Sequence, residues 1–270
     1  MMALKVEPPQ IDGYRYARHL GSGGYSEVFV YEDLQLGREV AVKVLTQGAS
    51  EDEARVMAQL ASHTHIVDVY SVGQTANGLA YLVMQLYSGP TFAQRLRSGP
   101  LRVAEVVQLG VQLSGAVEWA HRLGVLHRDI KPANILTSGT GRAGLADFGI
   151  STSGGSRSEQ TGVSLPWVPP EVLEGRAPDE LGDVYSLAAT LFTLLEGHPP
   201  FVVPGGDNSD HAVVGRTLTQ QPPTLSMPDA PPSLTALLRS AMSKSPDARP
   251  ASAEAFGRAL QGVEAELRLA

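Results

Sequence analysis

The first third of the chain alternates hydrophobic and polar residues in the manner of β-strands. This alternation predicts five strands, at residues 14–20, 27–31, 39–45, 67–73 and 79–85. In the third strand, the valines at 40, 42 and 44 share one face, and Lys43 lies on the other. Helical spacing over residues 51–61 predicts one amphipathic helix, and Asn77-Gly78 predicts a hairpin between the last two strands. The pattern therefore predicts a small antiparallel sheet with one main helix.

Beyond residue 88 the hydrophobic period becomes that of helices. It predicts helices over 106–124, 184–195 and 234–242, and another from 253 towards the terminus. The helix over 184–195 is almost wholly apolar, so we expect it in the centre of its domain. Segments rich in Ser, Gly or Pro predict loops over 152–161 and 203–210. The expected fold class is α+β, with a sheet lobe over 1–87 joined to a larger, mostly helical lobe over 88–270.

Composition narrows the class of protein. Of 270 residues, 43% are hydrophobic, and 28 acidic against 21 basic residues give a net charge of −7, which disfavours binding to nucleic acid or to anionic membranes. The absence of cysteine excludes disulfides, thiolate metal sites and cysteine nucleophiles, and it fits a reducing, cytoplasmic compartment. The first twelve residues lack the apolar core of a signal peptide, and no apolar run approaches the ~18 residues of a membrane span. We expect membrane attachment only if a longer natural chain continues past residue 270.

A glycine-rich turn and a lysine in an apolar strand form the first candidate for chemistry. Gly21, Ser22, Gly23 and Gly24 follow the first predicted strand, and glycine lets backbone N–H groups approach a triphosphate closely. Such a turn alone fits an ordinary hairpin equally well. Lys43, however, needs an anionic partner if it is buried, and phosphates under the turn or an acidic residue on the next helix would supply one. A lysine on an exposed strand face is the alternative.

The second candidate is a polar loop followed by an isolated carboxylate. Asp129, Lys131 and Asn134 lie within six residues, so together they can position a hydroxyl, pair with a phosphate and ligate a divalent cation. Thirteen residues after Asn134 comes Asp147, in Asp147-Phe148-Gly149 at the end of an apolar stretch. Oxygen ligands of this kind, shared with substrate phosphates, suit Mg²⁺.

These motifs, in this order, resemble the eukaryotic-type serine/threonine protein kinase catalytic domain, bacterial branch, over residues 14–260. Weaker motifs support the same resemblance. They are Pro169-Pro170-Glu171, Asp183 before the apolar helix, and Arg249, which resembles the arginine that pairs with the glutamate at position 171. The resemblance implies a bilobal protein-kinase-like fold. It also implies transfer of the γ-phosphoryl of ATP to serine or threonine hydroxyls of proteins, with Mg²⁺ as cofactor.

The resemblance also implies catalytic roles. Lys43 would hold the α- and β-phosphates and pair with a glutamate on the first helix, for which Glu53 is the first choice and Glu51 the rival. Asp129 would accept or orient the proton of the substrate hydroxyl. Lys131 would steady the γ-phosphate, and its position two residues after Asp129 is the serine/threonine form of the loop.

The ATP and metal sites follow from the same resemblance. Asn134 and Asp147 would hold Mg²⁺. Met84 stands at the gatekeeper position, so that Gln85 and Tyr87 would offer backbone groups to adenine. The implied ATP-binding residues are Leu20, Gly21, Ser22, Gly23, Gly24, Val28, Ala41, Lys43, Met84, Gln85, Tyr87 and Asn134.

Some positions depart from the family pattern. Ser26 replaces the third glycine of the glycine loop. Val163 stands for the usual glycine before the substrate-facing threonine, Ser164 replaces that threonine, and Trp167 replaces the usual tyrosine. Because the last three lie in the segment that grips the protein substrate, they put peptide specificity in doubt more than phosphoryl transfer.

The segment over 151–164 also suggests regulation. In this family an arginine such as Arg128 commonly binds a phosphate on this segment, and a phosphate there would order it through charge-assisted bonds. The candidate acceptors are Thr152, Ser156, Ser158 and Thr161. The alternative is a polar, mobile loop with no further role. We expect His127, beside Arg128, to have a structural role.

Three functions remain in competition. The first is an active protein kinase. The second is a pseudokinase or nucleotide-binding scaffold, which the presence of Lys43, Asp129, Asn134 and Asp147 together disfavours. The third is a small-molecule kinase, which would lack the Lys131 spacing and the paired glutamate and arginine. The expected partners are protein substrates and a second copy of the chain, since bacterial relatives often pair through the sheet lobe, although no surface in the sequence identifies this homodimer.

Overall fold

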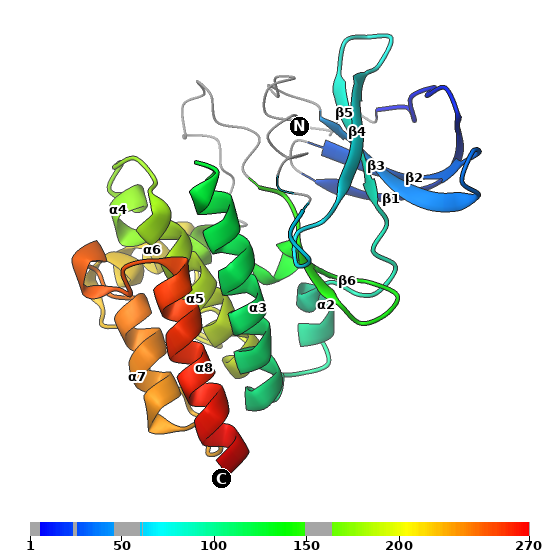
Figure 1. Cartoon of the computed structure of the whole chain (residues 1–270). Helices are drawn as coiled ribbons and strands as arrows, with labels where there is room; N and C mark the ends of the chain where they lie inside the picture. Colours follow the sequence, from blue (N-terminus) through cyan, green and yellow to red (C-terminus); the bar gives the residue numbers. More distant parts are fainter. Residues whose placement is uncertain (1–5, 24–25, 46–59, 61, 149–163, 270) are drawn as a thin grey trace.

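The computed structural model describes residues 6–23, 26–45, 60, 62–148 and 164–269, arranged in two lobes (Figure 1). A sheet occupies the first lobe and helices occupy the second. The helix predicted over 51–61, apart from Leu60, and the loop predicted over 152–161 lie outside these ranges. The bilobal α+β architecture that the hydrophobic pattern predicts is confirmed. None of the described helices is long and apolar enough to cross a membrane.

The sheet lobe contains five antiparallel strands in the spatial order β1-β2-β3-β5-β4. Their bounds are β1 Tyr14–Gly23, β2 Ser26–Asp33, β3 Arg38–Leu45, β4 Val69–Gln74 and β5 Ala80–Gln85. All five predicted strands are therefore present, and β1 runs further than predicted because Gly21 and Gly23 still pair with β2. The glycine-rich segment thus begins as part of the sheet rather than as a separate turn.

The two faces of β3 have different neighbours, as the alternation predicts. Val40, Val42 and Val44 are buried in an apolar cluster on the outer face of the sheet. Leu45 belongs to the core that continues into the helical lobe, and Lys43 pairs with a carboxylate of that lobe. The sheet therefore presents Lys43 to the space between the lobes.

The segment before β1 covers the outer face of the sheet. Val6 and Ile11 pack against the apolar cluster there, and the Tyr31 hydroxyl donates a 2.6 Å hydrogen bond to the Pro9 carbonyl. Burial, with smaller contributions from neighbouring tyrosines, raises the pKa of Tyr31 to about 12, so this hydroxyl remains a donor at neutral pH. This contact stabilises the side of the sheet that faces away from the helical lobe.

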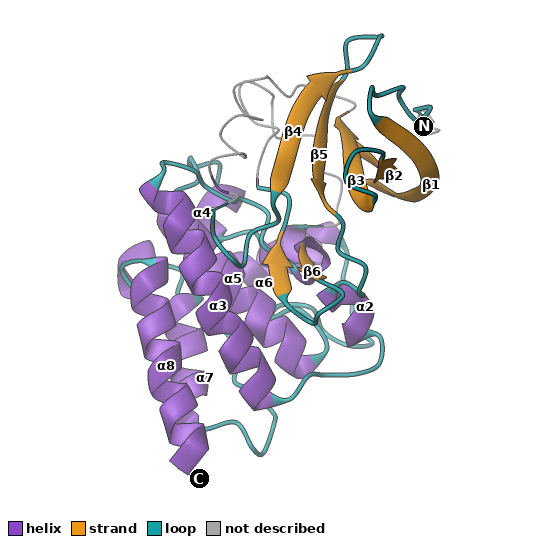
Figure 2. Ribbon diagram, turned by 45° about the vertical axis from the view of Figure 1, so that its right-hand side comes forward, coloured by secondary structure: helices purple, strands orange, loops and turns teal. Residues whose placement is uncertain are grey.

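The helical lobe is built around α5, with α3, α7 and α8 packed beside it (Figures 1 and 2). Its described elements are α2 Phe92–Leu96, α3 Val103–Arg122, β6 Ile135–Thr137, β7 Ala143–Leu145, α4 Pro170–Leu173, α5 Glu180–Glu196, α6 Asp210–Thr219, α7 Pro232–Ala241 and α8 Ala253–Leu269. Every residue from Gly182 to Leu195 is buried, which confirms the central position predicted for this helix. Short 3-10 turns occupy Pro132–Asn134, Leu165–Trp167 and Pro246–Ala248.

Five described helices and strands of this lobe were not predicted, namely α2, α4, α6, β6 and β7. The helix α2 has only five residues and begins with a capping box formed by Thr91 and Gln94, so it is too short to show a helical period. The helix α6 begins after Ser209, whose side chain accepts a hydrogen bond from the Ala212 amide, and it buries little apolar surface. The strands of the β6–β7 hairpin have three residues each.

Residues 85–89 connect the lobes and are held on both sides. The Gln85 amide donates to the Asp68 carbonyl at 2.8 Å, and the Gly89 amide donates to the Thr137 carbonyl of β6 at 2.9 Å. Figure 2 shows β6 below the sheet at this joint. The predicted division of the chain at residues 87 and 88 falls in this segment and stays a prediction.

Candidate active site

The polar loop that precedes β6 is held by one buried carboxylate, that of Asp183 near the start of α5. Asp183 Oδ2 accepts the His127 amide at 2.7 Å, and Oδ1 accepts the Arg128 amide at 2.8 Å. His121 Nε2 on α3 lies 2.9 Å from Oδ2. Arg128 adopts φ +67°, a conformation costly for a residue with a side chain, which these bonds help to maintain. The central helix therefore sets the position of the loop.

His127 links this loop to the segment after β7. Its side chain is fully buried, and Nε2 lies 3.0 Å from the Ala146 carbonyl, while Nδ1 accepts the Asp129 amide at 3.2 Å. These bonds require a proton on Nε2 only. Burial lowers the pKa of His127, despite nearby carboxylates that raise it, in agreement with a neutral ring. The ring centroid lies 4.4 Å from that of Phe148, so His127 acts as packing and support.

Asp129, Lys131 and Asn134 form one hydrogen-bonded unit. Asn134 Nδ2 donates to the Asp129 carbonyl at 2.8 Å and to its carboxylate at 3.0 Å. Lys131 Nζ lies 2.7 Å from Asp129 Oδ2 and 2.6 Å from the Ser164 hydroxyl. The Asp129 side chain is 36% exposed, so its carboxylate is within reach of an incoming hydroxyl. The unit can orient a hydroxyl and place a positive charge beside it.

Asp147 pairs with Lys43 across the lobes, with Nζ and Oδ1 2.6 Å apart. Asp147 has φ +64°, in the left-handed region that non-glycine residues rarely adopt. Burial alone raises the pKa of Asp147, but Lys43, with help from His127 and Lys131, outweighs it and brings the pKa below its usual value. Asp147 is therefore an anion at neutral pH, and it supplies the partner that a buried Lys43 needs.

The oxygen donors near this ion pair fit a hard divalent cation. Asn134 uses its amide nitrogen for Asp129, which leaves its carbonyl oxygen as the group able to bind a metal. The Asn134 backbone carbonyl accepts the Ala146 amide at 2.9 Å, so Asn134 lies beside the residue that precedes Asp147. Among the described residues no three His, Asp or Glu side chains form a metal cage. One carboxylate and one amide suit Mg²⁺ shared with phosphate oxygens.

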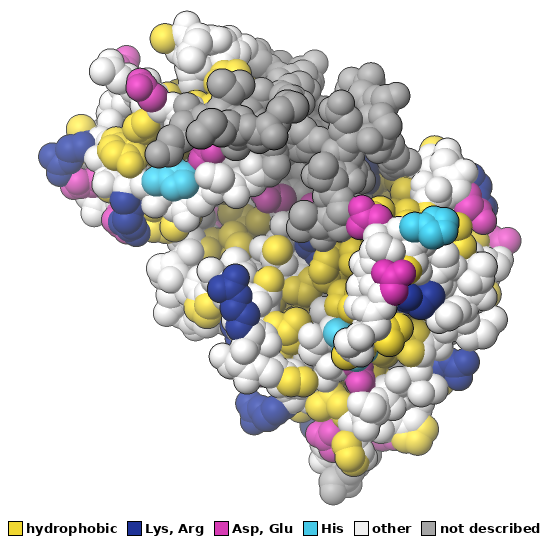
Figure 3. All heavy atoms as spheres, turned by 180° about the vertical axis from the view of Figure 1, so that it is seen from behind, with side chains coloured by type: hydrophobic (Ala, Val, Ile, Leu, Met, Phe, Trp, Pro, Cys, Tyr) yellow, Lys and Arg dark blue, Asp and Glu magenta, His cyan; other side chains and the backbone are white. Residues whose placement is uncertain are grey.

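A small, open pocket ends at the Lys43–Asp147 pair. Its walls are mostly apolar, and its lining residues are Lys43, Val67, Val69, Leu82, Met84, Ala146 and Asp147. Met84 lies opposite Ala41 in the β3–β5 register, and Val28 lies opposite Lys43 in the β2–β3 register. The structure thus brings four predicted ATP-binding residues together along β2, β3 and β5. Hydrophobic side chains are also visible between the lobes from behind (Figure 3).

Other predicted ATP-binding residues lie outside the lining of this pocket. Leu20 is 50% exposed on β1, and Gly21, Ser22 and Gly23 form the end of that strand. Sequence reasoning missed Val67, Val69, Leu82 and Ala146, which line the pocket. The hydrophobic pattern did not assign these four residues to the pocket, because the side of a strand or loop that meets the other lobe depends on tertiary packing.

The glycine-rich segment carries a polar cluster that sequence reasoning also missed. The Ser22 hydroxyl donates to Glu27 Oε2 at 2.8 Å, and His19 Nε2 lies 2.7 Å from the same oxygen. Glu27 is 7% exposed. These contacts join the end of β1 to the start of β2.

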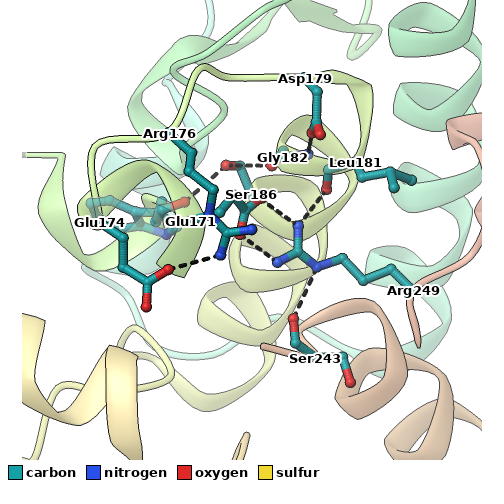
Figure 4. A network of polar contacts seen from close by, with 10 residues as sticks. Glu171, Glu174, Arg176, Asp179, Leu181, Gly182, Ser186, Ser243 and Arg249 are labelled. Carbon is teal, nitrogen blue, oxygen red and sulfur yellow. Dashed lines mark hydrogen bonds and ion pairs between the residues drawn. The ribbon is translucent and has the colours of Figure 1, made fainter. Parts of the chain in front are cut away.

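Glu171 and Arg249 form a buried bidentate ion pair (Figure 4). Both nitrogen–oxygen distances are 2.7 Å, and the side chains are 3% and 0% exposed. Arg249 also donates to the carbonyls of Ser243 at 2.9 Å and Leu181 at 3.0 Å. This is the pair that the resemblance implies, and it ties the start of α4 to the segment that precedes α8.

The turn containing Ser164 is fastened to α5. Trp167 Nε1 donates to the Thr193 hydroxyl at 3.0 Å, and the Ser186 hydroxyl donates to the Trp167 carbonyl at 2.8 Å. The departures from the family pattern at Ser164 and Trp167 therefore retain anchoring contacts. The same turn places the Ser164 hydroxyl against Lys131 Nζ.

Several predicted residues lie outside the described ranges, and their roles stay predictions. They are Gly24, Glu51, Glu53, Gly149, Thr152, Ser156, Ser158, Thr161 and Val163.

The two-lobed fold and this site define a protein kinase domain. The family model described as "Protein kinase domain" matches residues 14–259, and the chain belongs to that family. The serine/threonine-protein kinase PknK of Mycobacterium tuberculosis is 39% identical over 266 residues, which cover 93% of this chain and 24% of PknK. PknJ of the same organism is 38% identical, covering 92% of this chain and 44% of PknJ.

A third relative, PknB of Mycolicibacterium smegmatis, is 35% identical over 259 residues, which cover 88% of this chain and 41% of PknB. The chain thus spans between about a quarter and just under half of these relatives. All three are bacterial proteins, which confirms the bacterial branch of the family.

Proposed function

We propose that the domain transfers the γ-phosphoryl group of ATP to serine or threonine hydroxyls of proteins. The observation that carries this proposal is the hydrogen-bonded unit of Asp129, Lys131 and Asn134 beside the Lys43–Asp147 pair. The serine/threonine specificity is supported by the names of the bacterial relatives and by the contact of Lys131 with Ser164. The substrates of the whole protein belong to this proposal as well.

In the proposed reaction, the hydroxyl oxygen of the substrate attacks the γ-phosphorus as the bond to ADP breaks. Asp129 orients that hydroxyl and accepts its proton. Lys131 neutralises charge on the transferred group, because its ammonium lies between Asp129 and Ser164. Catalysis of this kind is mostly positioning and charge neutralisation, so it needs no covalent intermediate on the protein.

Asn134 and Asp147 would hold Mg²⁺, and Lys43 would bind the α- and β-phosphates. When bound, Mg²⁺ would supply positive charge to the phosphates. Because Lys43 also pairs with Asp147, one carboxylate would influence both positive charges of the nucleotide site. A cytoplasmic location, which the absence of cysteine fits, belongs to the same proposal.

Adenine would lie between Val28 and Ala41 above and the helical lobe below, with Met84 at the back. Met84 both lines the pocket and pairs with Ala41, which supports this placement. The backbone groups of Gln85 and Tyr87 would then bind the adenine edge, since Gln85 is the first residue after Met84 and Tyr87 is the third.

Phosphorylation of the segment over 151–164 would regulate the domain through Arg128. Mass spectrometry after incubation with ATP tests this idea, and absence of phosphate in 151–164 would overturn it. A homodimer through the sheet lobe is a further proposal, tested by sedimentation of the purified protein.

The proposed activity is tested with radiolabelled ATP, Mg²⁺ and a generic protein acceptor. Asp129→Asn should abolish label transfer and still bind ADP, because the Asp129 side chain lies with Lys131 and Ser164 rather than in the nucleotide pocket. ADP binding by the wild type without label transfer would instead indicate a nucleotide-binding scaffold. Label transfer to a small molecule and to no protein would indicate the third class of function.

A further inference from the structure

The Arg142 guanidinium connects the two lobes at residues 85–89, the segment between the lobes, here called the hinge. Arg142 directly precedes β7 in the helical lobe, and its Nη2 donates to the Gln85 side-chain oxygen at 3.1 Å. The same nitrogen lies 3.4 Å from the Tyr87 hydroxyl. Gln85 is the last residue of β5 in the sheet lobe, so Arg142 contacts the segment between the lobes at two positions.

Near Arg142, the hinge packs closely against the β6–β7 hairpin. Tyr87 is 7% exposed, and a Cβ added at Gly144 of β7 would lie 2.4 Å from its hydroxyl, so only glycine fits there. A Cβ at Gly89 would lie 2.8 Å from the Thr137 carbonyl, which accepts the Gly89 amide. The hinge therefore contacts the hairpin at both Tyr87 and Gly89.

The charges near Arg142 favour these contacts. Burial raises the pKa of Tyr87, and the Arg142 guanidinium offsets part of this rise, while Asp68 and Tyr70 add to it. Tyr87 thus stays a neutral phenol whose oxygen accepts from the guanidinium. On the opposite side, the Gln85 amide is bonded to the Asp68 carbonyl. Gln85 is held through its backbone by one lobe and through its side chain by the other.

We propose that Arg142 is a positioning residue that holds the backbone of Gln85 and Tyr87 in the conformation that binds adenine. This inference rests on the proposed function, which assigns adenine to those backbone groups. A hinge ordered before the nucleotide arrives loses less conformational freedom on binding, so its affinity for the nucleotide is higher. Removal of Arg142 should therefore weaken nucleotide binding. Phosphoryl transfer should be unchanged, because Arg142 does not line the pocket.

The test compares Arg142→Met, Gln85→Leu and the double variant with the wild type. Methionine keeps the apolar stem of arginine and removes its donors. ADP affinity with Mg²⁺ is measured by calorimetry, and KM for ATP, kcat and KM for the acceptor are measured separately. Arg258→Met on α8 is the matched control, because Arg258 is exposed and pairs with Glu254 on its own helix. Arg142→Lys tests rescue.

We expect Arg142→Met to weaken ADP binding and raise KM for ATP by about 3- to 10-fold, with kcat and acceptor KM within about twofold of wild type. Gln85→Leu should add little to Arg142→Met, since the two act through one contact. Wild-type ADP affinity in Arg142→Met, or a lower melting temperature with unchanged KM for ATP, would overturn the inference alone. Failure of the wild type to bind ADP would overturn the proposed function.

Discussion

The Lys43 ammonium on β3 lies 2.6 Å from the Asp147 carboxylate, 104 positions further along the chain. This ion pair joins the sheet lobe to the segment that follows β7. The Lys43 side chain is only 11% exposed, so its charge requires a nearby anion. The position of this ammonium therefore depends on the arrangement of both lobes.

Replacement of Asp147 tests the energetic part of this relationship. Asp147→Asn should lower the free energy of unfolding by about 1 kcal/mol at pH 7, a modest value because the Asp147 side chain is 43% exposed. The folded-state pKa of Asp147 is lowered, so the stabilisation is complete above the usual carboxyl pKa and is lost as the pH falls through the folded-state pKa. Urea unfolding from pH 7 towards pH 3 measures the difference. A difference that grows on acidification would contradict the ion pair.

The buried pair of Glu171 and Arg249 should matter far more for stability. Arg249→Met leaves a carboxylate that is 3% exposed without its partner, so we expect a loss of about 3–5 kcal/mol in urea unfolding. The double variant with Glu171→Gln should recover part of this loss, because it removes the unpaired charge. Arg258→Met, at an exposed pair, should change stability by less than about 1 kcal/mol. Equal effects at both sites would refute this interpretation.

The hydrogen bond between Lys131 and Ser164 should affect the protein acceptor rather than ATP. Ser164→Ala removes the hydroxyl 2.6 Å from Lys131 Nζ, so we expect kcat/KM for the acceptor to fall about 10-fold with KM for ATP unchanged. Ser164→Thr keeps the hydroxyl and should retain activity. The prediction fails if Ser164→Ala keeps wild-type kcat/KM for the acceptor.

Lys244 should destabilise the domain at neutral pH. Its Nζ lies 4.0 Å from the centre of the Phe201 ring and has no hydrogen-bond partner among the described residues. Burial, with the nearby Arg249 charge, lowers the pKa of Lys244 to about 8. Between pH 8 and the usual lysine pKa, the unfolded chain binds more protons than the folded one, so stability attributable to this group rises with pH in that window.

Lys244→Met should therefore raise the free energy of unfolding by about 1 kcal/mol at pH 7, since the group is only partly buried. The gain should shrink as the pH rises above 8. Thermal unfolding of both proteins at pH 7 and pH 9.5 measures it. A destabilised Lys244→Met at pH 7 would mean that the cation–ring contact outweighs desolvation.

Periodicity predicted the elements whose apolar stripes are long. The alternation in β3 and the apolar run of α5 were sufficient, because each of these elements buries extended surface. The helix α6 gave a weak signal because only Val213 and Thr217 are buried in it. Elements of three to five residues, such as α2 and β7, depend on caps and tertiary contacts rather than on periodicity.

The residues of the candidate site also fall into those that the sequence could predict and those that it could not. Asp129, Lys131 and Asn134 lie close in sequence, so their proximity in space could be expected. The contact of Lys43 with Asp147 and that of Arg142 with Gln85 join residues far apart in the chain. Such contacts depend on how the lobes meet, which local patterns do not contain.

The central claim is phosphoryl transfer to a protein hydroxyl through Asp129. Its most direct test is the initial rate of label transfer from γ-labelled ATP to a protein acceptor, followed by phosphoamino-acid analysis. We predict labelled phosphoserine or phosphothreonine with the wild type and a rate at least ~10³-fold lower with Asp129→Asn. An Asp129→Asn rate equal to that of the wild type, or no label on any protein hydroxyl, would contradict the claim.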